Sequence, residues 1–138
     1  MDTIRVGRVS SVNAKKGTVS VVYPDRNESA TDEMPYFSFG GIYRMPKKEQ
    51  MVVVLHLENG SSAGIVLGTY WNEIDNPTEG GADTFSMDMT GGALLKAVGG
   101  EIMLRGSGIT LDSGRSITVA EIIRKLDEYD ARISALGG

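Results

Sequence analysis

The stretch Gln50-Met51-Val52-Val53-Val54-Leu55-His56-Leu57 decides the fold class of the first half of the chain. It is short, rich in β-branched residues and almost entirely apolar, which is typical of a strand rather than a helix. Because polar residues do not alternate with apolar ones, we expect a strand that is buried on both faces. Asn59-Gly60 then predicts a turn, and residues 63–70 supply the partner strand.

Upstream of this strand the chain consists of short β-type runs separated by turn residues. Residues 4–9 and 19–23 read as two strands, joined by a hairpin connection at 13–17 and stopped at Pro24. A polar stretch, 25–33, separates them from a further run at 34–37. About five strands in about 70 residues, with glycine where a strand must bend, predict a small closed barrel of OB type over residues 1–72.

The pattern changes after a linker at 73–82, where Pro77, Gly80 and Gly81 mark a boundary. From there to Val119, short apolar pairs begin 8, 7, 7 and 8 residues apart, with glycines between them. Each repeat offers only one or two inward side chains. A buried aliphatic contributes about 2 kcal/mol, whereas ordering one residue opposes folding by about 1.5 kcal/mol, so a single chain cannot close this core.

Intertwining with identical copies would supply the missing burial, and the segment 83–117 is therefore predicted to be a trimeric β-helix stalk. Its predicted core residues are Phe85, Met87, Met89, Leu95, Ile102, Leu104, Ile109, Leu111 and Ile117.

The last segment, 118–138, switches to a helical period. Thr118 and Glu121 have the spacing of a capping box, in which each side chain satisfies an exposed amide of the other residue. Apolar residues then recur at spacings of 3, 4, 3, 4 and 3, which predicts a short coiled-coil helix in a trimeric bundle. The seam consists of Val119, Ile122, Leu126, Tyr129, Ile133 and Leu136.

The composition and net charge of the chain argue against several classes of function. The chain has no cysteine, no secretory signal at its start and no apolar run that could span a bilayer. Its net charge of −4 argues against non-specific binding to a polyanion, because such binding depends on Lys and Arg. His56 lies in the most apolar strand without a second donor nearby, so we expect a packed or rim histidine and no metal site.

The first 70 residues also resemble, at motif level, the OB-fold domain of the central spike family, which includes phage baseplate assembly protein V and the type VI secretion spikes. The ordered matching motifs are Gly7-Arg8-Val9, Gly17-Thr18-Val19-Ser20-Val21, Tyr23-Pro24-Asp25, Met34-Pro35-Tyr36, the run 43–52 and the run 64–72. Lys48 stands where many relatives have glycine. The resemblance covers about half of the chain.

The resemblance implies a barrel followed by a trimeric β-helix, in a structural protein without catalytic residues or cofactors. It implies a homotrimer in a virion or phage-tail-like particle, assembled in the bacterial cytoplasm, attached to the baseplate hub and driven into the target cell envelope. Tyr70 and Trp71 either contact that hub or anchor the stalk. Some relatives bind iron at the tip through a His-x-His motif, which is missing here, so the tip either pierces directly or carries a separate tip protein.

Two other functions compete with this hypothesis. An OB-fold nucleic-acid-binding protein would need only the barrel, but its site requires exposed aromatic residues interleaved with basic ones, of which the strands show little. A trimeric receptor-binding tail fibre segment would explain the stalk and the coiled coil, while leaving the barrel motifs as coincidence.

Overall fold

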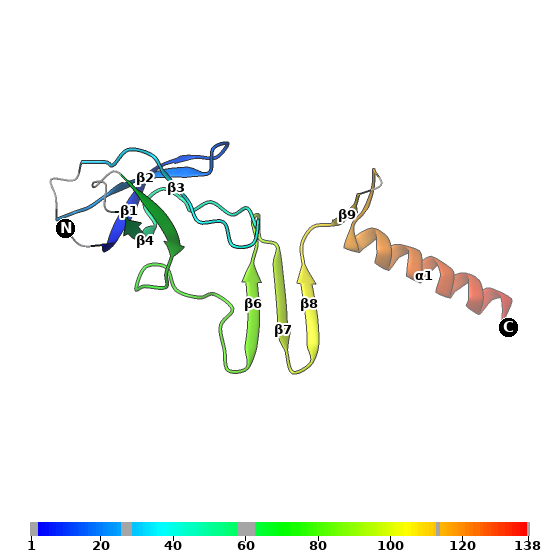
Figure 1. Cartoon of the computed structure of the whole chain (residues 1–138). Helices are drawn as coiled ribbons and strands as arrows, with labels where there is room; N and C mark the ends of the chain where they lie inside the picture. Colours follow the sequence, from blue (N-terminus) through cyan, green and yellow to red (C-terminus); the bar gives the residue numbers. More distant parts are fainter. Residues whose placement is uncertain (1–2, 26–28, 58–62, 113, 138) are drawn as a thin grey trace. The chain divides into compact units, whose positions relative to one another are not determined.

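The computed structural model of the chain describes residues 3–25, 29–57, 63–112 and 114–137. It divides into two units, Met1–Pro77 and Thr78–Gly138, and the division falls inside the segment 73–82 that the sequence marks as a linker. The described residues are mainly β, with one helix near the C-terminal end (Figure 1). The turn predicted at Asn59-Gly60 lies outside the described residues.

The first unit contains a five-stranded antiparallel sheet with the strand order β3-β2-β1-β4-β5. Its strands are β1 (Ile4–Asn13), β2 (Thr18–Val22), β3 (Met34–Pro35), β4 (Met51–His56) and β5 (Gly64–Thr69). The two edges of the sheet approach each other just after β3, where Tyr36 forms a parallel bridge with Val66. Since the amide of Phe37 also donates to the carbonyl of Val66 at 2.8 Å, the sheet forms a nearly closed, barrel-like structure.

The core of this unit is made largely of β-branched side chains that point inward from alternate strand positions. Its fully or almost fully buried members are Val9, Val19, Val21, Tyr23, Met34, Val52, Val54 and Val66. Gly7 allows the sheet to pack this tightly, because a Cβ atom at that position would lie 2.3 Å from Val21 Cγ1. The runs of valine that predict strands therefore also supply the core.

Strand β4 differs from the sequence-based expectation of burial on both faces. Val52, Val54 and His56 are buried, whereas Met51 and the residues at 53 and 55 are only half-buried. The physical reason is that a strand in a barrel has one face toward the core and one toward the outside. The outer face of β4 is thus apolar without being fully covered in the single chain.

The beginning of the predicted linker is a turn attached to the first unit. The side-chain oxygen of Asn72 accepts hydrogen bonds from the amides of Ile74 and Asp75 at 2.9 and 3.0 Å. The Asp75 carboxylate in turn accepts a hydrogen bond of 3.0 Å from the Gln50 side chain, next to the start of β4. This Asx turn fixes how the chain leaves the first unit.

The second unit consists of a three-stranded antiparallel meander, a two-stranded hairpin and a helix. The elements are β6 (Thr84–Asp88), β7 (Leu94–Val98), β8 (Glu101–Arg105), β9 (Ile109–Leu111), β10 (Arg115–Ile117) and α1 (Val119–Leu136). Gly99 and Gly100 connect β7 to β8 with φ angles of 58° and 85°, as the central residues of a type I′ turn require. Each apolar repeat of the sequence thus corresponds to one short strand and its turn.

Helix α1 begins with the capping box that the sequence indicates. The Thr118 side chain accepts a hydrogen bond of 3.1 Å from the amide of Glu121, whose carboxylate accepts one of 3.3 Å from the amide of Thr118. At the other end, the amide of Gly137 donates to the carbonyl of Ile133 at 2.8 Å. Both ends of the helix are therefore defined by local hydrogen bonds, without help from other elements.

Candidate assembly surfaces

The meander is an amphipathic sheet. In an antiparallel sheet, residues directly opposite each other on neighbouring strands point to the same face. The register pairs Phe85 with Ala97 and Ala97 with Ile102, and it pairs the next row in the same way. The apolar sheet face consists of Phe85 and Met87 on β6, Leu95 and Ala97 on β7, and Ile102 and Leu104 on β8.

This apolar sheet face is open in the single chain. The side chains of Ile102, Phe85 and Leu104 are 79%, 58% and 53% exposed. Burying an aliphatic or aromatic side chain of this size is worth about 1.5–3 kcal/mol. Soluble monomers rarely leave so many adjacent apolar side chains in water, so the face has the character of an interaction surface.

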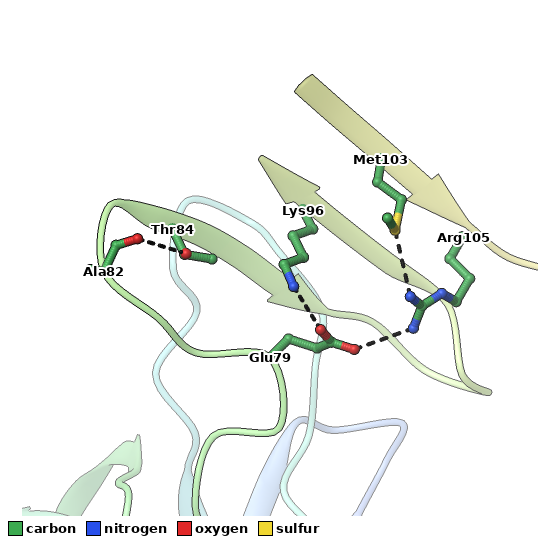
Figure 2. A network of polar contacts seen from close by, with 6 residues as sticks. All are labelled: Glu79, Ala82, Thr84, Lys96, Met103 and Arg105. Carbon is green, nitrogen blue, oxygen red and sulfur yellow. Dashed lines mark hydrogen bonds and ion pairs between the residues drawn. The ribbon is translucent and has the colours of Figure 1, made fainter. Parts of the chain in front are cut away.

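The opposite face of the meander is mainly polar, with Leu94, Val98 and Met103 as its apolar members, and it carries an ion-pair network (Figure 2). Glu79, which precedes β6, accepts a hydrogen bond of 2.8 Å from Lys96 Nζ on β7 and one of 3.3 Å from Arg105 Nη1 on β8. The hydrogen bond from Lys96, followed by that from Arg105, lowers the pKa of the Glu79 carboxyl. Charge is therefore concentrated on the face opposite the apolar one, although Leu94 is buried on the charged side.

The remaining predicted stalk residues lie outside the apolar sheet face. Ile109 and Ile117 are directly opposite each other in the β9–β10 hairpin, and both are partly exposed. Met89 follows β6, in a turn where its amide donates to the carbonyl of Ala93. Leu111 pairs with Arg115 at the other end of the hairpin.

Helix α1 has no buried residue. The helix seam, defined as Val119, Ile122, Leu126, Tyr129, Ile133 and Leu136, is exposed along its whole length. Exposure ranges from 37% at Ile122 to 88% at Leu136, and Ile123 next to the seam is 54% exposed. An 18-residue helix with such a seam is marginal in water by itself, because most helical stability comes from packing of the apolar face.

The first unit has two apolar surfaces that we did not predict from the sequence. The first is the barrel outer face, where Ile4 lies opposite Leu55 and Val6 lies opposite Val53. Its members are Ile4, Val6, Val53, Leu55, Ile65 and Leu67, of which Ile4, Val6 and Leu67 are 62%, 48% and 42% exposed. The signal in the sequence was the apolar character of both faces of residues 51–56.

The second unpredicted surface is an aromatic turn after β3. Phe39 and Ile42 are bridged across Gly40 and Gly41, whose φ angles of 63° and 81° are both positive. The exposed side chains on it are Phe37, Phe39, Ile42 and Tyr43. The turn is attached to the barrel because the Tyr43 hydroxyl donates to the carbonyl of Ala14 at 3.0 Å. Before the turn, burial raises the pKa of the Tyr36 hydroxyl.

Tyr70 and Trp71, the candidate hub contacts, follow β5. Trp71 is 67% exposed, and Tyr70 is half-buried. The carbonyl of Tyr70 accepts a hydrogen bond of 3.2 Å from the Asn72 side chain. Both residues therefore lie at the exit of the barrel, beside the turn that leads out of the first unit.

His56 is packed inside the barrel. It is 3% exposed and shares a hydrogen bond of 2.5 Å with the Tyr23 hydroxyl through Nε2. The Arg5 guanidinium stacks 3.8 Å from the centre of the Tyr23 ring and pairs with Asp25 at 2.7 Å. These side chains form a polar cluster at the end of the core, in which His56 Nδ1 is buried without a hydrogen-bond partner among the described residues. The described part of the chain contains no group of three or more His, Cys, Asp or Glu residues placed to hold a metal ion.

No protein-family profile matches the sequence, and no curated protein is significantly similar to it. Within the residues that the structure describes, no helix is long and apolar enough to cross a membrane.

Proposed function

We propose that this protein is the homotrimeric central spike of a phage tail or a related contractile particle. The observation that carries the proposal is the presence of two apolar surfaces in the second unit, the apolar sheet face and the helix seam, both open in the single chain. Within the second unit the short β9–β10 hairpin separates them in the sequence, so the same partner copies can cover both. In this proposal the first unit is an OB-fold barrel, and residues 83–117 form the stalk.

Association of identical chains fits the composition of the apolar sheet face. All six of its members are apolar, whereas interfaces between independent proteins are usually mixed. Three such sheets packed around one axis would bury their apolar faces and leave the Glu79 network on the outside. Covering Phe85, Ile102 and Leu104 in each chain would contribute several kcal/mol, at about 25 cal/mol per Å² of buried area.

The function of such an assembly is mechanical. Sheath contraction drives the particle's tube and spike against the target envelope, and the spike must stay rigid under the axial load. The interlocked chains cannot slip without exposing the apolar sheet face to water. No reaction and no cofactor enter this proposal.

The barrel is the part that we assign to attachment at the baseplate hub. Trp71 is exposed at the barrel exit, and the barrel outer face offers apolar side chains on three strands. A hub protein that covers Ile4, Val6 and Leu67 would remove the barrel outer face from water.

Electron microscopy of particles from the genome that encodes this chain tests the proposal. An antibody against the barrel should label the baseplate end of the tail, and deletion of the gene should give particles that no longer kill or infect. Label on lateral fibres would favour the tail fibre segment instead. Unchanged infectivity after the deletion would reject the spike.

One observation favours a second candidate, an OB-fold nucleic-acid-binding protein. Exposed Phe37, Phe39 and Tyr43 precede a basic stretch, and Tyr43 is bonded to the turn that carries the lysine pair 15–16. Aromatic rings beside basic residues are the elements of a single-strand binding site. Micromolar, salt-sensitive binding of labelled oligothymidine, weakened by Phe39→Ala, would support this candidate. Absence of binding at low salt would exclude it.

A further inference from the structure

The charged residues that flank the helix seam indicate whether two such helices would pair in a parallel or an antiparallel orientation. With Val119 at heptad position a, Lys125 and Arg132 occupy the two g positions that lie within the helix. Ile123 and Asp130 occupy the two e positions. Residues at e and g border the contact between helices of a coiled coil and select how the helices pair.

We propose that α1 pairs with the same helix of other copies of this chain, in parallel and in register, through Lys125 and Asp130. This inference rests on the proposed trimer and specifies how its C-terminal segment is arranged. In a parallel bundle, a residue at g faces the e residue of the following heptad on the neighbouring helix. Lys125 then faces Asp130 of the next copy, and in a trimer this attractive pair occurs three times.

An antiparallel arrangement of the same helices is disfavoured by charge. In that arrangement g positions face g positions, so Lys125 and Arg132 meet each other or themselves. Like charges in such positions repel, and no acidic residue occupies a g position to compensate. The distribution of charge thus selects the parallel arrangement and a second copy as the occupant of the helix seam.

Ile123 supports a bundle of more than two helices. A strict a and d seam is the narrow stripe of a two-stranded coiled coil, whereas an apolar residue at e widens the stripe. Ile123 is 54% exposed in the single chain and borders Val119 and Ile122 at the start of the helix. The wide stripe therefore begins next to the capping box of Thr118, where the chain enters the bundle.

The existing contacts of Lys125 allow this pairing. In the single chain its ammonium group lies 3.5 Å from Glu128, and both side chains are about half-exposed. Such an exposed pair within one helix is weak, so a change of rotamer toward Asp130 of a neighbour meets little resistance. Lys125 and Asp130 are five residues apart on one helix and do not face each other there.

A charge-reversal cycle on the full chain tests the inference. Lys125→Glu and Asp130→Lys should each lower the melting temperature of the helical signal by a few degrees, and the double variant should recover most of that loss. Because the two positions do not touch within one helix, recovery reports contact between copies. If the two losses simply add, Lys125 and Asp130 do not pair, and the inference is overturned.

Cysteine cross-linking supplies an independent measurement, since the chain has no native cysteine. With Leu136→Cys, a parallel register places the new thiols side by side and should give disulfide-linked dimers within the trimer. An antiparallel arrangement separates them by about the length of the helix, about 27 Å for 18 residues, and gives none. Ala131→Cys, at the outward f position, is the matched control and should stay unlinked.

Molar mass from light scattering separates the two possible failures. A trimer whose Leu136→Cys variant does not cross-link contradicts the parallel helix bundle and leaves the spike proposal in place. A monomeric chain contradicts both.

Discussion

The two units of the chain differ in whether they can bury their own apolar residues. In the first unit, Val9, Val52 and Val54 are completely buried between strands. In the second, β8 is exposed along its length and α1 has no buried residue, although both are rich in aliphatic side chains. The difference teaches that similar apolar patterns in the sequence produce a buried core in one unit and apolar surfaces that stay exposed in the single chain in the other.

The physical origin of the difference is the number of strands that share a core. Five strands that nearly close on themselves let inward residues from opposite walls meet. Three strands of five residues each form a single layer, whose apolar side has no second layer among the described residues of the unit. Such a sheet needs another layer, and identical copies supply it in our proposal.

Among the changes considered, a charge introduced on the apolar sheet face should weaken the association of the copies most. Ile102→Asp with Leu104→Asp would place two unpaired carboxylates in each buried interface, at a cost of several kcal/mol per chain. We expect a monomer whose barrel remains folded, measured by light scattering and by circular dichroism. Ser86→Asp on the polar face is the control and should keep the assembly. An intact trimer in the double variant would show that this face is not the interface.

Disruption of the helix seam should unfold α1 but weaken the association of the copies less. Ile122→Asp with Leu126→Asp should abolish the helical signal at 222 nm and leave the molar mass unchanged, because in our proposal the stalk contributes most of the association. The control Arg124→Ala, at an outward position, should keep the helix. Complete dissociation of the Asp variant would show that α1, and not the stalk, holds the copies together.

Overpacking of the barrel should change the stability of the first unit alone. Gly7→Ala places a methyl group against Val21 and the Tyr23 ring, and it should destabilise the barrel by about 1–3 kcal/mol in urea unfolding. The control Gly17→Ala meets open space and carries only the strain of its positive φ of 68°, about 1 kcal/mol. A change in molar mass with Gly7→Ala would mean that the two units do not behave independently.

Removal of the Glu79 network should lower the melting temperature least, and the size of this decrease should depend on pH. The folded chain lowers the Glu79 pKa from its ordinary value of 4.5, so the network stabilises the fold above that pH. The contribution is lost as the pH falls through the lowered pKa. The difference in melting temperature between the wild type and Glu79→Gln should therefore be small at pH 7 and decrease further as the pH falls below 4.5. A difference that grows in acid would contradict the network.

Local signals in the sequence predicted the elements that depend on neighbours along the chain. The runs of valine marked the strands of the barrel, and the Thr118–Glu121 spacing marked the start of the helix. Alternation at Phe85 and Met87 indicated inward side chains, and the register brings both together with Leu95 and Leu104.

Contacts between residues that are far apart along the chain could not be predicted from the sequence. Glu79 meets Lys96 and Arg105 across 17 and 26 residues, and no pattern in the linker marks it as their partner. Phe37 and Phe39 alternate as strand residues do, yet two glycines with positive φ turn the chain there and leave both rings exposed. Strand pairing and turn geometry, rather than composition, decide such surfaces.

The molar mass of the full chain in solution tests the central claim most directly. Light scattering coupled to size exclusion at micromolar concentration should give three times the 14.8 kDa of the single chain, with no change on dilution. A stable mass of one chain would contradict the account, because the apolar sheet face and the helix seam would then remain in water without partners.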